Sequence, residues 1–310
     1  MTARTLESSP SILPLYARAA APMIPGASLL PFVPGGGGEI PDIELDLTGV
    51  RAKPENVAAY AKVCGFALRD HLPPTYPHVL AFPLHMAVMA DGGFPFGAVG
   101  LVHVENRIEQ HRRIGIGEEL AINVRPTKLQ PHSKGRTFSL LTKVSVDGDV
   151  VWESTSTMLR RGSRGDASKQ PADGTKSRHI DDFEAHRQAV WSLGGDLGRS
   201  YASVSGDRNP IHMHSLTAKP LGFPGAIAHG MWTKARCLAA LDSRLPDAFA
   251  VDVRFRKPIL LPGRVEFASA TEGEEIAFAV RDAKRQTPHL DGRARPLEPK
   301  PNANTGRKSK

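Results

Sequence analysis

The sequence predicts an α+β fold of two related halves, in each of which a curved antiparallel sheet wraps around a central apolar helix. Three observations predict it: a short internal repeat, the same order of strand patterns in both halves, and an apolar helical segment ahead of each set of strands. A helix that is apolar over most of its surface has to be covered on several sides, and a curved sheet supplies that cover. Two such sheets paired edge to edge would hide two edges that otherwise promote aggregation.

The internal repeat relates two eight-residue segments at a constant offset of 141. Residues 59–66 (AYAKVCGF) align with residues 200–207 (SYASVSGD), and four of the eight positions are identical. Between the halves, residues 160–179 are polar, interrupted by Gly and Pro, and without apolar periodicity, which is typical of a linker. The predicted organisation is a leader (1–40), a first half (41–160), a linker (161–180), a second half (181–296) and a basic tail (297–310).

The helices and strands are expected in the same order in each half. Mostly apolar helical segments lie at about 80–90 and 229–241. After them, apolar and polar residues alternate with a period of two, which marks strands with one buried face. In the first half these strands are expected at 102–108, 119–130, 136–146 and 150–159, the last two joined by a hairpin at Asp147-Gly148. Their counterparts in the second half are 251–256, 263–271, 274–281 and 287–295.

Length and cysteine content restrict the class of protein. A chain of 310 residues can bury one large core or two of ordinary size. Cys64 and Cys237 both lie in apolar runs, which favours buried free thiols and a reducing, cytoplasmic location over a disulfide framework. The N-terminal apolar run is broken by Pro14, so we expect an ordinary leader packed on the first domain rather than a secretory signal; an organelle transit peptide is the alternative. We expect no membrane span, because no segment approaches about 18 uninterrupted apolar residues.

The formal charge of +8 does not indicate a nucleic-acid partner. Residues 159–178 carry an excess of four positive charges and residues 281–310 an excess of six, so the rest of the chain has a small negative balance. No Cys/His finger, aromatic RNA-binding strand or recognition-helix pattern accompanies these charges. They are therefore interpreted as solvated segments of a linker and a tail.

The clearest chemical signal lies between Tyr201 and Trp232. Asp207 precedes His212 by five residues, and His229-Gly230 opens the second apolar helical segment seventeen residues later. A carboxylate and an imidazole held close on a tight turn can move protons. A backbone N–H at a helix start can stabilise an oxyanion. The pattern indicates an acid–base enzyme acting on a carbonyl compound.

The string Gly206-Asp207-Arg208-Asn209-Pro210-Ile211-His212, followed by Ala228-His229-Gly230-Met231, resembles the signature of the MaoC-like, or hydratase 2, family. That family comprises (R)-specific enoyl-thioester hydratases and 3-hydroxyacyl-thioester dehydratases of the hotdog fold. The resemblance extends over most of residues 41–296, where the chain is similar to the two-hotdog members. It implies a double hotdog, joined as a pseudo-dimer, that needs no metal and no bound cofactor beyond the coenzyme A or acyl-carrier-protein phosphopantetheine carrying its substrate.

The chemistry implied by the resemblance assigns a role to each catalytic residue. His212 suits the base that takes a proton from water, and Asp207 can orient the same water and exchange the other proton. Which member of the pair protonates C2 is left open, because an interacting pair titrates as a unit. The resemblance points to the backbone N–H of Gly230 as the oxyanion donor.

Four further residues are candidates for substrate binding: Asn209, His229, Arg208 and Lys257. Asn209 is expected to fix the turn or to hydrogen-bond the dyad, and His229 either contacts substrate or only orients the helix start. Arg208 and Lys257, like Lys219 and Arg256, can meet carrier phosphates, although solvated cations are an equally good interpretation. A zinc site of His212, His214 and His229 is an alternative that lacks a fourth ligand.

The two halves are chemically unequal. Phe66 stands at the position of Asp207, Leu68 and Arg69 replace Asn209 and Pro210, and His71 falls at the offset of His212. Since phenylalanine cannot transfer a proton, the second half is expected to perform the chemistry and the first to supply walls of an acyl pocket. Those walls are expected near Phe82, Pro83 and Phe94, with Phe66→Ala altering substrate preference or stability.

The predicted function is that of a hydro-lyase of fatty-acid metabolism. It would interconvert (R)-3-hydroxyacyl and trans-2-enoyl thioesters, with an acyl carrier protein as a further possible partner and pairing into a homodimer left open. Two alternatives remain: hydrolysis of acyl thioesters, as other hotdog proteins perform with an acidic residue, and a non-catalytic acyl-carrier-binding subunit.

Overall fold

The computed structural model describes residues 2–20, 38–162 and 186–298. Most of the predicted linker and of the basic tail therefore lies outside the described residues. Within them, no helix is both long and apolar enough to cross a membrane. Cys64 and Cys237 are buried and free, as expected from their apolar surroundings.

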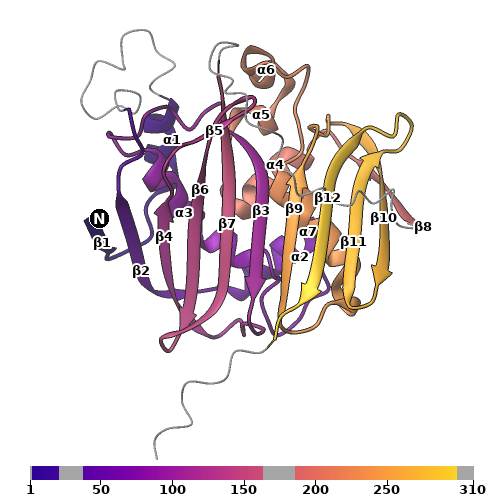
Figure 1. Ribbon diagram of the computed structural model, residues 1–310, viewed down its shortest axis with the longest axis horizontal. Coiled ribbons are helices and arrows are strands. Elements are labelled where there is room, and N and C mark those ends of the chain that lie inside the picture. The colour runs from indigo at the N-terminus through magenta and orange to yellow at the C-terminus, as the bar shows by residue number, and fades with distance from the viewer. Residues whose placement is uncertain (1, 21–37, 163–185, 299–310) are drawn as a thin grey trace, which may run out of the picture.

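The described strands form one continuous twelve-stranded sheet (Figure 1). Its order is β1-β2-β4-β6-β7-β3-β9-β12-β11-β10-β8, and the short β5 pairs with β6. The strands are β1 (Thr2–Leu6), β2 (Ile43–Arg51), β3 (Val102–Gln110), β4 (Glu119–Pro126), β5 (Gln130–His132), β6 (Gly135–Val146), β7 (Asp149–Arg161), β8 (His186–Leu193), β9 (Phe249–Phe255), β10 (Gly263–Glu272), β11 (Glu275–Asp282) and β12 (Pro288–Pro296). All pairs are antiparallel except β1 with β2.

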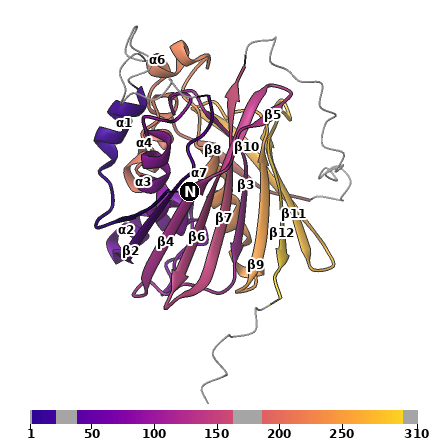
Figure 2. The ribbon, with the colours of Figure 1, turned by 60° about the vertical axis from the view of Figure 1, so that its left-hand side comes forward.

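The helices gather on one face of this sheet (Figure 2). They are α1 (Ile12–Ala20), α2 (Pro54–Cys64), α3 (Tyr76–Met89), α4 (Leu197–Ser205), α5 (Pro210–Met213), α6 (Ser215–Ala218) and α7 (Gly230–Leu241), with 3-10 turns η4 (Lys219–Leu221) and η5 (Asp242–Arg244). The two predicted apolar helices are α3 and α7, and most of their residues are buried. α3 begins four residues earlier than expected, with Pro77 in its first turn; proline fits there because that N–H needs no intrahelical acceptor.

The two halves meet where β3 pairs with β9, so the predicted edge-to-edge join of two sheets is confirmed. Two ion pairs cross the join: Arg107 to Asp252 at 2.9 Å and Arg254 to Glu105 at 2.9 Å. The predicted double hotdog is therefore one continuous sheet that curves around a buried helix in each half.

The strand predictions are confirmed in both halves, with one difference in the first. The Asp147-Gly148 hairpin is present, and both residues have positive φ (50° and 89°), as a tight two-residue turn requires. The strand expected at 119–130 instead ends at Pro126 and the chain pairs again only at Gln130–His132. After Pro126 the N–H of Thr127 still donates to the carbonyl of Ser139, but the N–H of Ser139 donates to the Thr127 hydroxyl instead of a backbone carbonyl, which interrupts the ladder.

The internal repeat marks two helix ends with the same backbone geometry. α2 ends at Cys64 and is capped by Gly65 with φ 82°, while α4 ends at Ser205 and is capped by Gly206 with φ 76°. Glycine reaches this left-handed conformation without strain, and it turns the chain sharply out of the helix. In the second half that turn delivers Asp207.

Lys234 on α7 is fully buried beside the join between the halves. Its ammonium nitrogen lies 3.1 Å from the carbonyl oxygen of Asn106, 2.5 Å from the Asn106 side-chain oxygen and 3.2 Å from the carbonyl oxygen of Val251. Asn106 in turn donates to the hydroxyls of Ser154 and Ser156. Burial holds the pKa of Lys234 well below its ordinary value.

Lys234→Ala is expected to lower the free energy of unfolding by roughly 2–4 kcal/mol, since it leaves buried acceptors without their donor and opens a cavity. Chemical denaturation of both proteins measures the change. Lys62→Ala, at an exposed position of α2, is the matched control and should stay within about 0.5 kcal/mol of the parent. An equal, small effect in both variants would contradict the stabilising role of Lys234.

Candidate active site

Asp207 lies directly after the Gly206 cap of α4, where the chain turns toward α5. Its carboxylate oxygen Oδ1 accepts hydrogen bonds from the hydroxyl of Tyr16 (2.8 Å) and the backbone N–H of Asn209 (3.1 Å). The other oxygen, Oδ2, lies 3.8 Å from Nε2 of His229. One oxygen is thus held by the protein while the other faces the histidines.

His212 is buried on α5, which begins at Pro210 and is capped by the side chain of Asn209. Its Nδ1 lies 2.8 Å from the carbonyl oxygen of Ile227. Because a carbonyl can only accept, Nδ1 carries the proton of the neutral ring and Nε2 keeps a free lone pair. This arrangement is suited to a general base.

His229 and Gly230 form the start of α7. The His229 ring stacks on that of His212 at 3.6 Å between centroids, and its Nε2 donates to the backbone carbonyl of Asp207 at 3.0 Å. Gly230 is the first helical residue, so its N–H has no intrahelical acceptor and points out of the helix start. A Cβ on Gly230 would lie 3.1 Å from the ring of Phe255, so glycine allows this close contact.

Burial has the largest influence on the pKa of each ionisable side chain here. It lowers the pKa of His212, with the Asp207 charge opposing it, and it lowers the pKa of His229 to about 3. For Asp207, burial raises the pKa, but interactions with His229 and His212 and hydrogen bonds from Tyr16 and Asn209 outweigh it and leave the pKa below its ordinary value. At neutral pH the site therefore holds a carboxylate beside two neutral imidazoles.

These residues line a cavity of about 840 Å³. Six of the seven predicted site residues line this one space, and five of them are Asp207, His212, Gly230, Asn209 and His229. The exposed Lys257 also lines it.

Two predicted positions are not part of this wall. Arg208 is exposed and does not line the cavity; its backbone N–H donates to the hydroxyl of Tyr16. His214 is exposed as well, so the three-histidine zinc set is not assembled among the described residues. Asp207, His212 and His229 do place one possible ligand atom each within 4.8 Å of one another.

The first half also contributes to the wall, through one face of α3 and through residues of β3, β6 and β7. His78, Phe82, His85 and Met89 recur at helical spacing along that face and line the cavity. This lining is consistent with the expectation that the first half supplies walls of the acyl pocket. Phe82, which was expected near the pocket, is one of the lining residues. The spacing of three and four residues was a signal for this face that the sequence analysis did not use.

Two of the residues expected near the wall do not line the cavity. Pro83 is buried on another side of α3, and Phe94 packs against Phe96 and Phe138 in the core, so neither lines the cavity. Phe66 does not line it either. It lines a separate pocket of about 20 Å³, which has room for about one water molecule.

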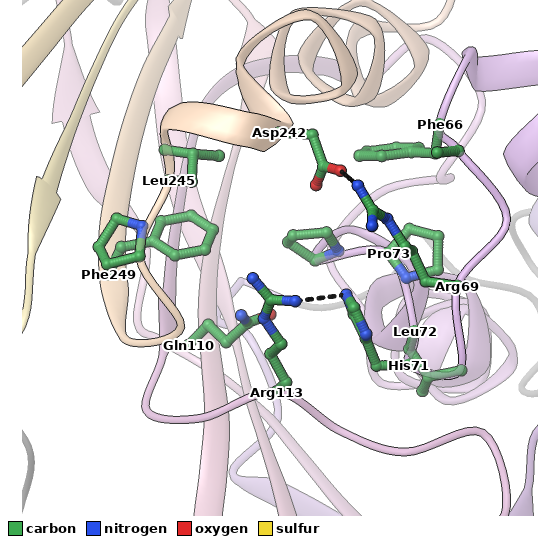
Figure 3. A pocket seen from close by; sticks show the side chains of 13 residues that line it. Phe66, Arg69, His71, Leu72, Pro73, Gln110, Arg113, Asp242, Leu245 and Phe249 are labelled. Atoms are coloured by element: carbon green, nitrogen blue, oxygen red, sulfur yellow. Dashed lines mark hydrogen bonds and ion pairs between the residues drawn. The ribbon is translucent and has the colours of Figure 1, made fainter.

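This small pocket is the first half's counterpart of the site (Figure 3). Phe66 follows Gly65 as Asp207 follows Gly206, and His71 lies at its rim. Arg69 pairs with Asp242 at 3.6 Å, and Arg113 lies 3.3 Å from Nε2 of His71. Phe66, Arg69 and Arg113 line this pocket, which is far smaller than the cavity that Asp207 lines.

Tyr16 is the contact that the sequence analysis missed. It comes from α1 in the predicted leader, 191 residues from Asp207. No local pattern in the sequence marks it, because only the fold brings the two together.

Known proteins show the same sequence pattern and fold. The model of the family described as "MaoC like domain" matches residues 169–292. The chain is 36% identical over 271 residues to 3-hydroxyacyl-thioester dehydratase X of Mycobacterium tuberculosis, an alignment that covers 87% of this chain and 95% of that protein. The crystal structure of HtdX from the same organism superposes with a TM-score of 0.72 at 35% identity, covering 82% of this chain and 100% of the other.

A second M. tuberculosis crystal structure, described as having a double hotdog fold, matches with a TM-score of 0.53 at 13% identity. It covers 80% of this chain and 93% of the other, and at that identity it supports the fold alone. The long match at 36% identity, together with the family model over the second half, establishes the family. The chain belongs to the MaoC-like dehydratase family and has its double-hotdog architecture.

Proposed function

We propose that the protein reversibly dehydrates (R)-3-hydroxyacyl thioesters to trans-2-enoyl thioesters. The observation that carries the proposal is the meeting of the Asp207 carboxylate, the His212 imidazole and the start of α7 at Gly230 on one cavity. The relative of 36% identity is named a 3-hydroxyacyl-thioester dehydratase, which supports the same class of reaction.

In the hydration direction, Nε2 of His212 takes a proton from a water molecule as its oxygen attacks C3. Asp207 orients that water through its free oxygen. A C3–O bond forms, the C2–C3 double bond becomes single, and C2 receives a proton from the Asp207–His212 pair, which returns to its starting state. These proton transfers require a neutral imidazole and an ionised carboxylate, which are the protonation states that the lowered pKa values favour.

The backbone N–H of Gly230 is proposed to stabilise the negative charge that builds on the thioester oxygen. The first turn of a helix presents N–H groups without internal partners, and the helix dipole favours negative charge there. One such donor typically lowers the barrier by about 2.7–4 kcal/mol. A Cβ at Gly230 would lie 3.1 Å from the ring of Phe255, so a side chain there would require that ring to shift.

The carrier part of the bound substrate is proposed to extend out of the cavity past Lys257. There a cation can contact the phosphates of coenzyme A or of a phosphopantetheine arm. Arg256, which also lines the cavity, is paired with Asp291 at 2.6 Å, so Lys257 is the better candidate. Arg208 lies away from the cavity wall and has no place in this proposal.

Phe82→Ala is expected to shift activity toward longer or bulkier acyl chains, because it enlarges the wall contributed by α3. One extra or missing methylene group in an apolar pocket changes discrimination between substrates by about 10- to 200-fold. The ratio of kcat/KM values across thioesters of increasing length measures the shift. Phe66→Ala is the matched control, since Phe66 lines the separate small pocket. A chain-length shift with Phe66→Ala but not with Phe82→Ala would contradict this placement of the acyl chain.

The proposed function is tested by incubating the protein with 2-enoyl thioesters of several lengths on both carriers. Loss of enoyl absorbance without release of free thiol is the expected result. Thiol release instead would identify an acyl-thioester hydrolase, and binding without turnover at any length would identify a carrier-binding subunit.

A further inference from the structure

A tyrosine of the N-terminal helix contacts the carboxylate of the second-half site. The hydroxyl of Tyr16 donates to Oδ1 of Asp207 at 2.8 Å and accepts from the backbone N–H of Arg208 at 2.7 Å. It therefore uses its donor and one acceptor position, and both bonds are made to the turn that carries the carboxylate.

The helix that carries Tyr16 is fixed against both halves. α1 packs against α3 of the first half. On the other side, Cδ1 of Ile12 lies 2.6 Å from the position that a Cβ of Gly206 would occupy. Gly206, whose φ is positive at 76°, therefore also lies in contact with α1.

The Tyr16 hydroxyl remains a hydrogen-bond donor throughout the working pH range. Burial, followed by the charge of Asp207, raises the pKa of Tyr16 above its ordinary value. A neutral phenol that points at one carboxylate oxygen stabilises the ionised form of that carboxylate. It also prevents rotation of the carboxylate, which leaves Oδ2 directed toward His229.

We propose that Tyr16 is a positioning residue for the reaction: through its bond to Oδ1 it holds Asp207 ionised and in the orientation that presents Oδ2 to the reacting water. The N-terminal segment, ahead of the first repeat, is then a working part of the second half's site. The inference rests on the proposed function for its kinetic consequences, but the state of Asp207 is measurable without turnover.

The test is Tyr16→Phe, which keeps the ring and removes the hydroxyl. Removal of a charge-assisted hydrogen bond of this kind should lower kcat by roughly 10- to 100-fold and leave KM little changed. Without the phenol the pKa of Asp207 rises, so a larger fraction is protonated at a given pH. The acid limb of the kcat/KM profile should therefore move to higher pH.

Tyr60→Phe is the matched control. Tyr60 is fully buried in the first half, and its hydroxyl donates to the Thr75 hydroxyl at 2.8 Å. Its loss should reduce stability without moving the acid limb. Equal loss of stability in both variants with the acid limb unmoved in both would assign Tyr16 a structural role only and overturn the inference.

Carboxyl-carbon NMR of Asp207, assigned with the Asp207→Asn variant, gives a second measurement that does not depend on activity. The carboxylate should titrate at higher pH in Tyr16→Phe than in the parent. An unchanged titration overturns the inference even if the parent is an active hydratase. Conversely, the titration of Asp207 could differ between the parent and Tyr16→Phe although the parent hydrates no enoyl thioester. That result would retain the Tyr16–Asp207 linkage and reject the proposed function.

Discussion

Replacing His212 by alanine is expected to lower kcat for hydration by about 10²- to 10⁴-fold, the range that a positioned general acid or base contributes. The physical reason is the tautomer of His212. Its Nδ1–H donates to the carbonyl oxygen of Ile227, so Nε2 carries the lone pair that can accept a proton from water. His229 is a poor substitute, because its Nε2–H donates to the backbone carbonyl of Asp207 and its Nδ1 is buried.

Asp207→Asn should cause a loss of similar size, and the double variant should be scarcely worse than either single variant, since residues that act as a unit are not additive. Initial rates of enoyl hydration, at substrate concentrations that separate kcat from KM, provide the measurement. His214→Ala is the matched control: it removes an exposed imidazole two residues along the chain that does not line the cavity. Activity of His212→Ala close to that of His214→Ala would reject His212 as the base.

The pH dependence follows from the directions of the two pKa values. Both lie below their ordinary values, so the carboxylate and the neutral imidazole persist through neutral pH. Hydration should decline only as the pH falls through the lowered values and the pair takes up a proton. The apparent constants belong to the pair rather than to either residue.

Gly198→Ala is the second change with a large expected effect. Gly198 is buried in α4, and a Cβ there would lie 1.9 Å from the carbonyl oxygen of His212. Such a distance requires α4 and α5 to separate. Alanine would otherwise favour the helix by about 1 kcal/mol, but overpacking of this kind typically destabilises by about 1–3 kcal/mol. A displacement of the base by about 1 Å can also lower kcat by roughly 100-fold.

Gly195→Ala provides the control, because a Cβ at that position meets only Pro262, at 3.8 Å. Thermal unfolding and enoyl hydration should both be nearly unchanged in it. If Gly198→Ala kept parental kcat, the packing of α4 against the His212 turn would have no part in placing the base.

The sequence predicted the strands well because their signals are local. Alternating residues in β3 and β9 and the Asp147-Gly148 turn act over a few positions, and tertiary structure did not override them. The site was predictable for the same reason: Asp207, His212 and Gly230 lie within one continuous stretch.

Features that depend on distant parts of the chain were not predictable in this way. β8 follows the polar stretch between the halves, and its eight residues acquire strand geometry by pairing with β10. Tyr16 reaches Asp207 only through the packing of α1 against α3 and the turn at Gly206. The alignment of Phe66 with Asp207 likewise could not show that the first half has a separate, small pocket at that position.

The division of the large cavity between the two halves has a consequence for divergence and for engineering. The groups assigned to proton transfer come from residues 207–230, whereas the wall on α3 and the neighbouring strands β3, β6 and β7 comes from residues before 162. Mutational libraries confined to α3 and these strands can therefore explore new acyl specificities while Asp207, His212 and the Tyr16 contact remain unchanged. Duplication of a hotdog unit, followed by loss of one set of reactive groups, is a route by which such independence can arise.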